Sequence, residues 1–384
     1  MVVERLLPTS EAHDLLDLVR EISREQLAPR ASQAEADGAF PRDVFTLLGS
    51  VGLLSLPFEE GHGGGGQPYE VYLQVLEEIA TAWMSVAVDV SVHTLAAFAT
   101  AKFGTSKQRA TLLPGMLGGE ELGAYALSEP QAGSDVSAIA TKAVRDGEDY
   151  VVTGTKAWIS HGPHADFFLL FARTAPDPKG GLTAFHVPAG IEGMTFGAPE
   201  KKMGMTASTT AQLIFDGARV HASYRLGDEG DGMRIALSAL DSGRLGIAAA
   251  STGLAQAALD LAVGYAQERH QFGRAIAEFQ GLQFLLADMA AAVDTARSQY
   301  LYAARLRDAG RDFSRAASVA KLVATDAAMR VTTDAVQVLG GYGYTRDFPA
   351  ERYMREAKVT QIFEGTNQVQ RMVIARSLLR PPRR

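Results

Sequence analysis

The sequence YVVTGTKAWIS, residues 150–160, decides the fold because it interrupts a chain that otherwise shows helical patterns. It is rich in β-branched and aromatic residues. FFLLFART (167–174), LTAFHVPAG (182–190) and TAQLIFDGARV (210–220) follow it with the same character. Glycine, proline and aspartate separate these short stretches, which is typical of strands in an antiparallel sheet or barrel. We therefore expect a β domain in the middle third of the chain.

Helical patterns lie on both sides of this region. Residues 10–28 carry apolar side chains at helical spacing, and long helical patterns run from about residue 69 to residue 101 and through most of the last third. The glycine-rich segment LGDEGDGM (226–233) resembles a hinge out of the sheet. Because strands do not alternate with helices, a doubly wound nucleotide-binding fold is not expected. The sequence predicts an α+β chain with three domains: a helical domain at 1–121, a central antiparallel β domain at 122–228, and a helical domain at 229–384.

Composition excludes several classes of function. The chain has 384 residues, with 37 Lys plus Arg against 44 Asp plus Glu, so its formal charge of −7 argues against nucleic acid as a partner. The absence of cysteine excludes disulfides, thiolate metal sites and a cysteine nucleophile. The N-terminus has no signal-peptide pattern, and no stretch is expected to match the roughly 18 to 20 apolar residues of a membrane span. We expect a cytoplasmic protein.

Two stretches in the middle of the chain could hold a ligand. YALSEPQAGSD (125–135) combines hydroxyl groups, a proline turn and a Gly-Ser step, so it could present backbone N–H groups to a polar ligand. It also fits a solvated connection rich in turn residues. KAWISHG (156–162) places a tryptophan two residues before a serine, which suits the wall of a site for an aromatic group, although a tryptophan in a strand usually belongs to the core.

Two further stretches lie in the helical last third. ERHQFGRAIAEFQ (268–280) places an arginine near a helix end, where it could bind a pyrophosphate, a partner subunit or only solvent. QVLGGYGYTRDFPAERYMRE (337–356) has glycines that permit close backbone approach to a phosphate, which alone is a weak signal. His161, His164 and Asp166 match no metal-binding motif, so no metal site is expected.

Together these stretches resemble the acyl-CoA dehydrogenase family over nearly the whole chain. ALSEPQAGSDVSA (126–138) and QVLGGYGYTRDFPAERYMRE (337–356) are similar to two family signatures, and AWIS, RHQFGR and FEGTNQVQR occur in the family's order. The resemblance implies a helical N-terminal domain, a central β domain and a C-terminal four-helix bundle. It also implies non-covalent FAD, an acyl-CoA substrate, an electron-transfer flavoprotein as electron acceptor and usually a homotetramer.

The resemblance assigns site residues by their match to the family motifs. FAD contacts are implied for a loop and a strand in the middle domain, for residues that meet the FAD of a neighbouring subunit, and for two residues near the C-terminus: Tyr125, Leu127, Ser128, Gly133, Ser134, Trp158, Ile159, Ser160, then Arg269, Gln271, Phe272, Gln280, Gln337, Gly340, Gly341, then Thr366 and Gln368. Substrate contacts are implied for Ser134, Asp241, Arg244 and Gly365.

Glu364, in QIFEGTNQVQR (361–371), resembles the catalytic base of the family. Removal of the α-proton of a thioester needs a positioned carboxylate and a stabilised enolate oxygen. An apolar pocket raises the pKa of a carboxyl group, and no cation follows Glu364 until Arg371. The resemblance implies that the backbone N–H of Glu364 can donate to the thioester carbonyl. It further implies that the β-hydrogen leaves as hydride to flavin N5, giving a trans-2-enoyl thioester.

Some branches of the family place the base directly before the arginine that corresponds to Arg244. Here that position is Gly243, so Glu364 is the base that the resemblance leaves. The glycine-rich loop GHGGGGQP (61–68) and Thr206-Ala207 depart from the family pattern, and both are candidates for shaping the mouth of the site. The side chains that set acyl length are open. Those at positions 84, 88, 92 and 93 are candidates, although residues at helical spacing more often belong to the plain core.

Three functions compete. The leading hypothesis is an FAD-dependent acyl-CoA dehydrogenase, which would be yellow and bleached anaerobically by a suitable acyl-CoA. The second is an acyl-CoA oxidase, which would release peroxide, or a flavin monooxygenase on the same scaffold, which needs no base at Glu364. The third is a non-catalytic protein that binds acyl-CoA, in which replacement of Glu364 by glutamine would leave turnover unchanged.

Overall fold

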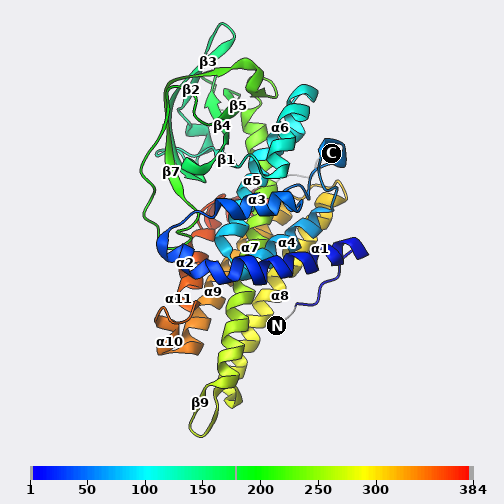
Figure 1. The fold of residues 1–384 in the computed structure, drawn as a ribbon, viewed down its shortest axis with the longest axis vertical. Helices are drawn as coiled ribbons and strands as arrows, with labels where there is room; N and C mark the ends of the chain where they lie inside the picture. Colours follow the sequence, from blue (N-terminus) through cyan, green and yellow to red (C-terminus); the bar gives the residue numbers. More distant parts are fainter. Residues whose placement is uncertain (1–2, 178–179, 380–384) are drawn as a thin grey trace.

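The computed structural model describes residues 3–177 and 180–379. Its chain builds a helical part, then a sheet, then a second helical part, which confirms the predicted α+β class. Figure 1 shows the sheet at one end of the molecule and the longest helices running from beneath it to the opposite end. The proposed domain boundaries fall in two connections, between Gly118 and Gly123 and between Leu226 and Gly232.

Within the described residues, the N-terminal part has six α-helices, two of which are capped at the start by the side chain of the preceding residue. The side chain of Thr9 accepts a hydrogen bond from the N–H of Ala12 at 3.1 Å, and Thr105 forms a capping box with Gln108. A single π-helical stretch, Ser23–Leu27, separates the first two helices. The helices are α1 (Ser10–Ile22), α2 (Ala28–Asp37), α3 (Arg42–Ser50), α4 (Tyr69–Ala82), α5 (Met84–Phe103) and α6 (Ser106–Gly118).

The central sheet has eight strands and is mainly antiparallel, with the order β6-β7-β3-β2-β4-β5-β8. Strand β1 pairs with β4 in parallel, as β2 does through one residue pair, so the expected purely antiparallel sheet is mixed at this point. The strands are β1 (Gly123–Ala126), β2 (Lys142–Asp146), β3 (Asp149–Ser160), β4 (Phe167–Arg173), β5 (Leu182–Pro188), β6 (Met194–Phe196), β7 (Thr210–His221) and β8 (Arg225–Leu226). Buried β4 and β5 are nearly continuous apolar runs, whereas β7 alternates because one face is less covered.

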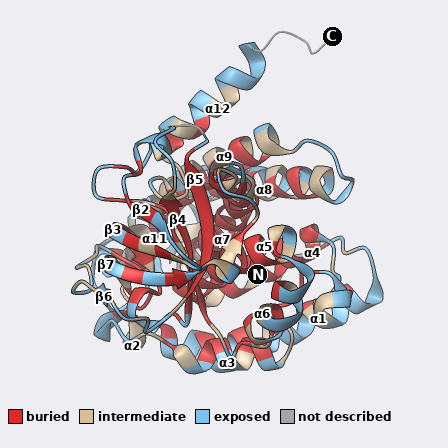
Figure 2. Cartoon of the chain, turned by 90° about the horizontal axis from the view of Figure 1, so that it is seen from above, coloured by how far each residue is buried: buried red, intermediate tan, exposed pale blue. Residues whose placement is uncertain are grey.

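The C-terminal part packs three long helices against one another, with shorter helices beside them. The elements are α7 (Gly232–Glu268), the hairpin β9 (His270–Gln271) and β10 (Arg274–Ala275), α8 (Gln280–Asp308), α9 (Ser314–Leu339), α10 (Gly341–Tyr344), α11 (Ala350–Thr360) and α12 (Asn367–Leu379). Helix α4 of the first part also packs against α7 and α8, so the two helical parts share one apolar core. Figure 2 shows buried residues gathered along these central helices, while α12 leads away from them.

Helices α5 and α7 are long and apolar enough to cross a membrane, so the expectation that no stretch reaches that length is wrong. Within their most apolar windows, 89% and 78% of the residues, respectively, are buried inside the protein. Such burial is what core helices show, because a helix surrounded by protein is apolar on every side.

One face of α7 carries glycines where neighbouring groups come closest. A Cβ built on Gly253 would overlap the backbone carbonyl of Glu77 in α4, and one built on Gly246 would overlap the hydroxyl of Ser91 in α5. Gly243, one turn earlier, lies on the same side of the helix. Glycine at these positions therefore permits the close approach of α4 and α5 to α7.

We predict that Gly253→Ala destabilises the protein by about 1–3 kcal/mol, because the added methyl group would overlap a backbone carbonyl that cannot move away freely. The midpoint of denaturant unfolding measures this loss. Gly264→Ala on the same helix is the control, since a Cβ there meets nothing within 4 Å. A stable Gly253→Ala protein would show that α4 and α7 can separate without cost.

Candidate active site

Glu364 occupies a strained turn between α11 and α12. Its φ is 51°, in the left-handed region that residues other than glycine rarely adopt, and Gly365 follows with φ 88°. The hydroxyl of Thr366 then accepts a hydrogen bond from the N–H of Val369 at 3.2 Å, which caps the start of α12. The flexible Gly-Thr step in the sequence therefore turns the chain back and begins the next helix.

The turn is held by hydrogen bonds to its carbonyl groups. Lys321 Nζ on α9 donates to the carbonyl of Gly365 at 3.0 Å and to Oδ1 of Asn367 at 2.9 Å. The side-chain amide of Gln370 donates to the carbonyls of Gly365 and Glu364, at 2.8 and 3.3 Å. The side-chain amide of Gln370 therefore bonds to the backbone of the turn and not to the carboxylate of Glu364.

The carboxylate of Glu364 lies against α7 at the position that has no side chain. A Cβ built on Gly243 would overlap Oε2 of Glu364 and approach Leu95 Cδ1 at 3.2 Å. Both carboxylate oxygens are buried, and neither has a hydrogen-bond partner within residues 3–177 and 180–379. Arg371, the first cation after Glu364 in the sequence, pairs instead with Asp326 at 3.1 Å.

Burial raises the pKa of Glu364 to about 7. Lys321 and Arg244 act in the opposite direction because each brings a positive charge near the carboxyl group. Neither cation forms a hydrogen bond with it, since Lys321 bonds to the turn and Arg244 donates to Asp241 at 2.5 Å. The result is a carboxyl group that changes charge near neutral pH, which suits a general base.

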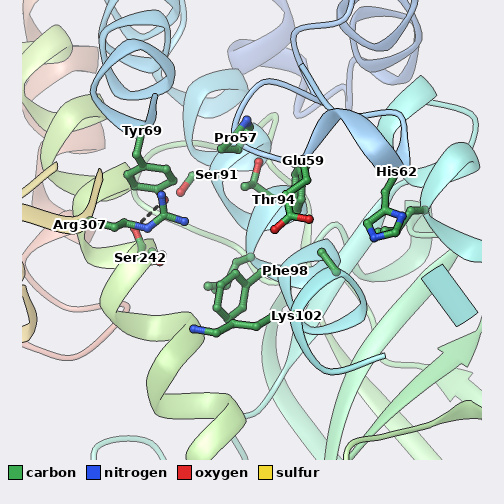
Figure 3. A pocket seen from close by; sticks show the side chains of 15 residues that line it. Pro57, Glu59, His62, Tyr69, Ser91, Thr94, Phe98, Lys102, Ser242 and Arg307 are labelled. Carbon is green, nitrogen blue, oxygen red and sulfur yellow. Dashed lines mark hydrogen bonds between the residues drawn. The ribbon is translucent and has the colours of Figure 1, made fainter. Parts of the chain in front are cut away.

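A cavity of about 300 Å³ lies between the helices, and Figure 3 shows side chains that line it. Its wall includes Gly243 and Leu95, the two residues that Glu364 approaches. Helices α4, α5, α6, α7 and α8 and the loop before α4 supply the remaining lining: Pro57, Phe58, Glu59, His62, Tyr69, Ser91, Thr94, Phe98, Ala101, Lys102, Leu113, Ser242 and Arg307. The carboxylate is therefore positioned to reach a group bound in this space.

The middle domain brings two predicted segments together beside Glu364. The hydroxyl of Tyr125 donates to the carbonyl of Ala236 at 3.2 Å, and burial, with Glu364 nearby, raises the pKa of Tyr125 well above its ordinary value. Further along the chain, the N–H of Ala157 donates to the carbonyl of Ser128 at 2.9 Å. The loop after β1 and the end of β3 therefore lie side by side.

Trp158, on β3, is not a core residue. Its side chain is 63% exposed and its φ is 63°, so the strand is bent to place a flat ring at the surface. Its neighbour Ile159 is buried and Ser160 is half-buried, whereas Gly133 and Ser134 in the facing loop are exposed. An exposed tryptophan beside free loop backbone fits the wall of a site for a planar ligand.

A buried ion pair holds this wall in place. Lys156 Nζ donates to Glu129 Oε1 at 2.8 Å and to the carbonyl of Leu127 at 3.0 Å. Glu129 also accepts hydrogen bonds from the N–H groups of Ala140 and Thr141. Burial acts to raise the pKa of Glu129, but Lys156 and these hydrogen bonds outweigh it and hold the pKa low. The sequence pattern did not single out this pair, although a lysine and a glutamate inside apolar strands are a signal of buried pairing.

The second group of predicted FAD residues lies at the opposite end of the molecule. The hairpin β9–β10 stands far from the sheet in Figure 1, and the residues there and nearby are exposed: Arg269, Gln271, Phe272, Gln280, Gln337, Gly340 and Gly341. Arg269 lies over the ring of Tyr342 at 6.0 Å, so the hairpin and α10 form one surface. Within one chain these residues do not meet Glu364 or Trp158.

The remaining predicted residues divide between site and surface. Asp241 and Arg244 form a partly buried ion pair on α7, and Nε of Arg244 has no partner in the part of the chain that is described. Gly365 follows Glu364 directly. Gln368 is exposed in the first turn of α12, close in sequence to Glu364 and Gly365, whose carbonyl groups accept the hydrogen bonds described above.

Four candidates for the wall of the cavity belong to the core instead, which is the alternative that helical spacing favoured. Met84, Val88, Val92 and His93 are buried but do not line it, so they are core residues; His93 accepts a hydrogen bond from the N–H of Gly123 at 2.9 Å. The α5 residues that line it follow mainly in the later turns of the helix: Ser91, Thr94, Leu95, Phe98, Ala101 and Lys102.

The two departures from the family pattern lie in different places. Glu59 and His62, beside the glycine-rich loop, line the cavity, whereas the hydroxyl of Thr206 donates to Glu35 away from it. No cluster of three potential metal ligands occurs among the described residues. His161 is buried, with Nε2 3.2 Å from Asp89, and Asp166 pairs with Arg42 at 2.7 Å.

The fold and the site define a three-part protein in which a buried carboxylate faces a cavity between helices. Three family models match in order: the acyl-CoA dehydrogenase N-terminal domain at residues 9–120, the middle domain at 124–218 and the C-terminal domain at 230–379. The chain belongs to the acyl-CoA dehydrogenase family, whose members are FAD-dependent oxidoreductases.

Full-length relatives agree with this assignment. The chain is 42% identical to an acyl-CoA dehydrogenase of Bacillus subtilis, with 97% of this chain and 98% of the relative covered. The structure of butyryl-CoA dehydrogenase from Megasphaera elsdenii matches with a TM-score of 0.96 at 39% identity, covering 98% of this chain and 100% of that one. A chain in the structure of the electron transferring flavoprotein of Acidaminococcus fermentans matches with a TM-score of 0.96 at 41% identity, with the same coverage. The chain has acyl-CoA dehydrogenase activity.

We predict that Gly243→Ala lowers kcat by about 100-fold, because its methyl group would displace the carboxylate of Glu364, and a misplacement of about 1 Å has such an effect. Turnover of an acyl-CoA with an artificial electron acceptor measures it. Gly264→Ala is again the control, and wild-type kcat in Gly243→Ala would contradict the placement of the carboxylate.

Proposed function

We propose that the enzyme converts an acyl-CoA thioester to the trans-2-enoyl-CoA and that Glu364 removes the α-proton. The observation that carries the proposal is the buried, unpartnered carboxylate against Gly243 at the wall of the cavity. A carboxylate without hydrogen bonds is a stronger base than one held by an ion pair, because no direct partner stabilises its charged form.

The turn also offers a donor for the developing enolate oxygen. The N–H of Glu364 makes no hydrogen bond within the described residues, so it can donate to the thioester carbonyl. Gly365 keeps the backbone beside it unobstructed. Ser134 in the exposed loop, together with the Asp241–Arg244 pair, is proposed to bind the CoA part, and the unpartnered Nε of Arg244 supports a polar contact there.

The residues present fit FAD, which accepts the β-hydrogen as hydride when it is bound. The exposed ring of Trp158, at a positive φ, supports a flat aromatic group beside it. Tyr125, Leu127, Ser128 and Gly133 provide loop backbone on one side, with Ile159 and Ser160 on the other. Thr366 and Gln368 are further proposed contacts, at the start of α12.

We predict that Glu364→Gln lowers kcat by about 10²- to 10⁴-fold while FAD remains bound, because glutamine keeps the shape but cannot accept a proton. Stopped-flow reduction of the flavin by acyl-CoA, without oxygen, measures the step. Wild-type rates in this variant would remove Glu364 as the base.

The pH dependence provides a separate prediction. Because the pKa of Glu364 is about 7, the base is protonated below that pH, so kcat/KM should fall as pH drops through about 7. The stability effect has the opposite sign: a carboxyl with a raised pKa binds its proton more tightly when folded, so its contribution to stability increases as pH falls through 7. A flat kcat/KM between pH 5.5 and 8.5 would contradict the buried site.

A second copy of the chain is proposed to complete the FAD site, in a tetramer. Phe272 is 94% exposed and Tyr344 is 84% exposed, and large apolar side chains at that level are suited to cover by a partner. Arg269, Gln271, Gln280, Gln337, Gly340 and Gly341 share that end of the molecule and would meet the FAD held by the neighbour. An electron-transfer flavoprotein is the proposed acceptor, in keeping with the structural similarity described above.

Complementation tests this arrangement. Arg269→Ala should lose FAD, and Glu364→Gln should lose turnover. Co-expressed subunits carrying one change each should recover part of the activity, because one class of site then contains both intact residues. Activity no higher than in the separate variants would place both residues at the same subunit's site.

A further inference from the structure

One cation inside the cavity has no role in the function proposed above. Arg307 comes from the last turn of α8, and its guanidinium carbon lies 3.6 Å from the centre of the Tyr69 ring. Figure 3 shows the side chain extending beneath that ring toward the interior of the cavity. The side chain is 24% exposed, so most of its surface is removed from solvent.

The guanidinium group has no strong partner. Its one carboxylate neighbour within the described ranges is Asp308, at 4.0 Å, and no hydrogen bond joins the guanidinium group to another residue there. The carboxylate of Asp308 is occupied by other donors, because its two oxygens accept hydrogen bonds from the N–H groups of Tyr69 and Glu70 at 2.9 and 3.1 Å. This carboxylate caps the start of α4. The N–H groups of Arg307 are therefore available to a ligand.

Arg307 and the base face the same wall. The hydroxyl of Tyr69 donates to the carbonyl of Ser242 at 3.1 Å, and Ser242 directly precedes the glycine against which Glu364 lies. Burial raises the pKa of Tyr69 to about 12, with Arg307 lowering it and Glu364 raising it, so both charges act on one phenol. A ligand that reaches from Glu364 along Tyr69 meets Arg307.

The other charges in the lining are placed differently. Glu59 and Lys102 are exposed residues at the rim, where water can hydrate them, and Lys102 lies over two phenylalanine rings. Ser91 and Thr94 are buried hydroxyl residues in the wall; Ser91 has no hydrogen-bond partner in the described ranges, and Thr94 accepts from Tyr72 at 3.0 Å. Apolar side chains such as Phe58, Leu95 and Phe98 make up much of the rest of the lining, so the cavity is largely apolar and its interior is positive at Arg307.

An acyl chain whose terminal methyl group lies beside Arg307 fits poorly at that point. The methyl group would displace water from the guanidinium group of Arg307 without offering it a hydrogen-bond acceptor. Burial of a charge without a partner is unfavourable for binding. A terminal carboxylate matches the planar fork of the guanidinium group with two parallel hydrogen bonds. We propose that the cavity selects acyl-CoA substrates whose chain ends in a carboxylate, with Arg307 as the residue that determines this specificity. The inference rests on the proposed function.

Matched thioesters test the proposal in the FAD-loaded enzyme. Glutaryl-CoA is compared with pentanoyl-CoA, and adipyl-CoA with hexanoyl-CoA, by kcat/KM with an artificial acceptor. We expect the carboxylate form to be preferred by about tenfold or more in at least one pair, the size of effect that a charge-assisted hydrogen bond has. Arg307→Met should bring that ratio to about one, and Arg307→Lys, which keeps charge without the fork, should give an intermediate ratio.

Arg305→Met is the control on the same helix. Arg305 is exposed, pairs with Glu70 at 2.7 Å and does not line the cavity, so the preference should be unchanged. A wild-type preference for the methyl-ended chain in both pairs would overturn the inference. So would an equal loss for all four thioesters in Arg307→Met, because that result places Arg307 at a phosphate of CoA. If the wild-type enzyme oxidises none of the four, the proposed function itself fails.

Discussion

The carboxylate of Glu364 depends on a helix position that has no side chain. Gly243 leaves room on α7 for Oε2, and no larger residue would permit the carboxylate to lie there. The close packing of α4 and α5 against the same helix face requires Gly253 and Gly246 in the same way. The glycine face of α7 therefore determines both the packing of the helical core and the place of the reacting group.

The surrounding positive charges limit how far burial raises the pKa of Glu364. Burial alone would raise the pKa of the carboxyl group further, and a direct ion pair would lower it and make the carboxylate a weaker base. Lys321 and Arg244 lie close enough to lower the pKa of Glu364, but neither donates a hydrogen bond to its carboxylate. Lys321 donates to the turn, and Arg244 donates to Asp241. The pKa near 7 is the balance of these effects, and the strained backbone at Glu364 is maintained because Lys321 and Gln370 hold its carbonyl groups.

Much of the fold and part of the site could be predicted from the sequence. The strand-rich middle third and its helical flanks are visible in local patterns, because period and turn residues depend on neighbours in the chain. Glu364 was identified through its similarity to a family motif. The role of Lys321 in holding the turn was missed, since a single lysine within an apolar helical pattern is normally assigned to the surface. Tyr69 and Arg307 were missed as well, because residues so far apart in sequence show no common pattern.

The sequence by itself determined the order of helical and strand regions and the family, and it singled out Glu364 as the proposed base, since each depends on short stretches whose meaning is local. Only the tertiary structure decided that Trp158 is exposed, that Met84, Val88 and His93 belong to the core, and that Arg307 enters the cavity. The physical reason is that burial and charge at a site come from several elements brought together by packing. Which face of a helix meets the cavity is set by those partners, and helical spacing alone fits either face.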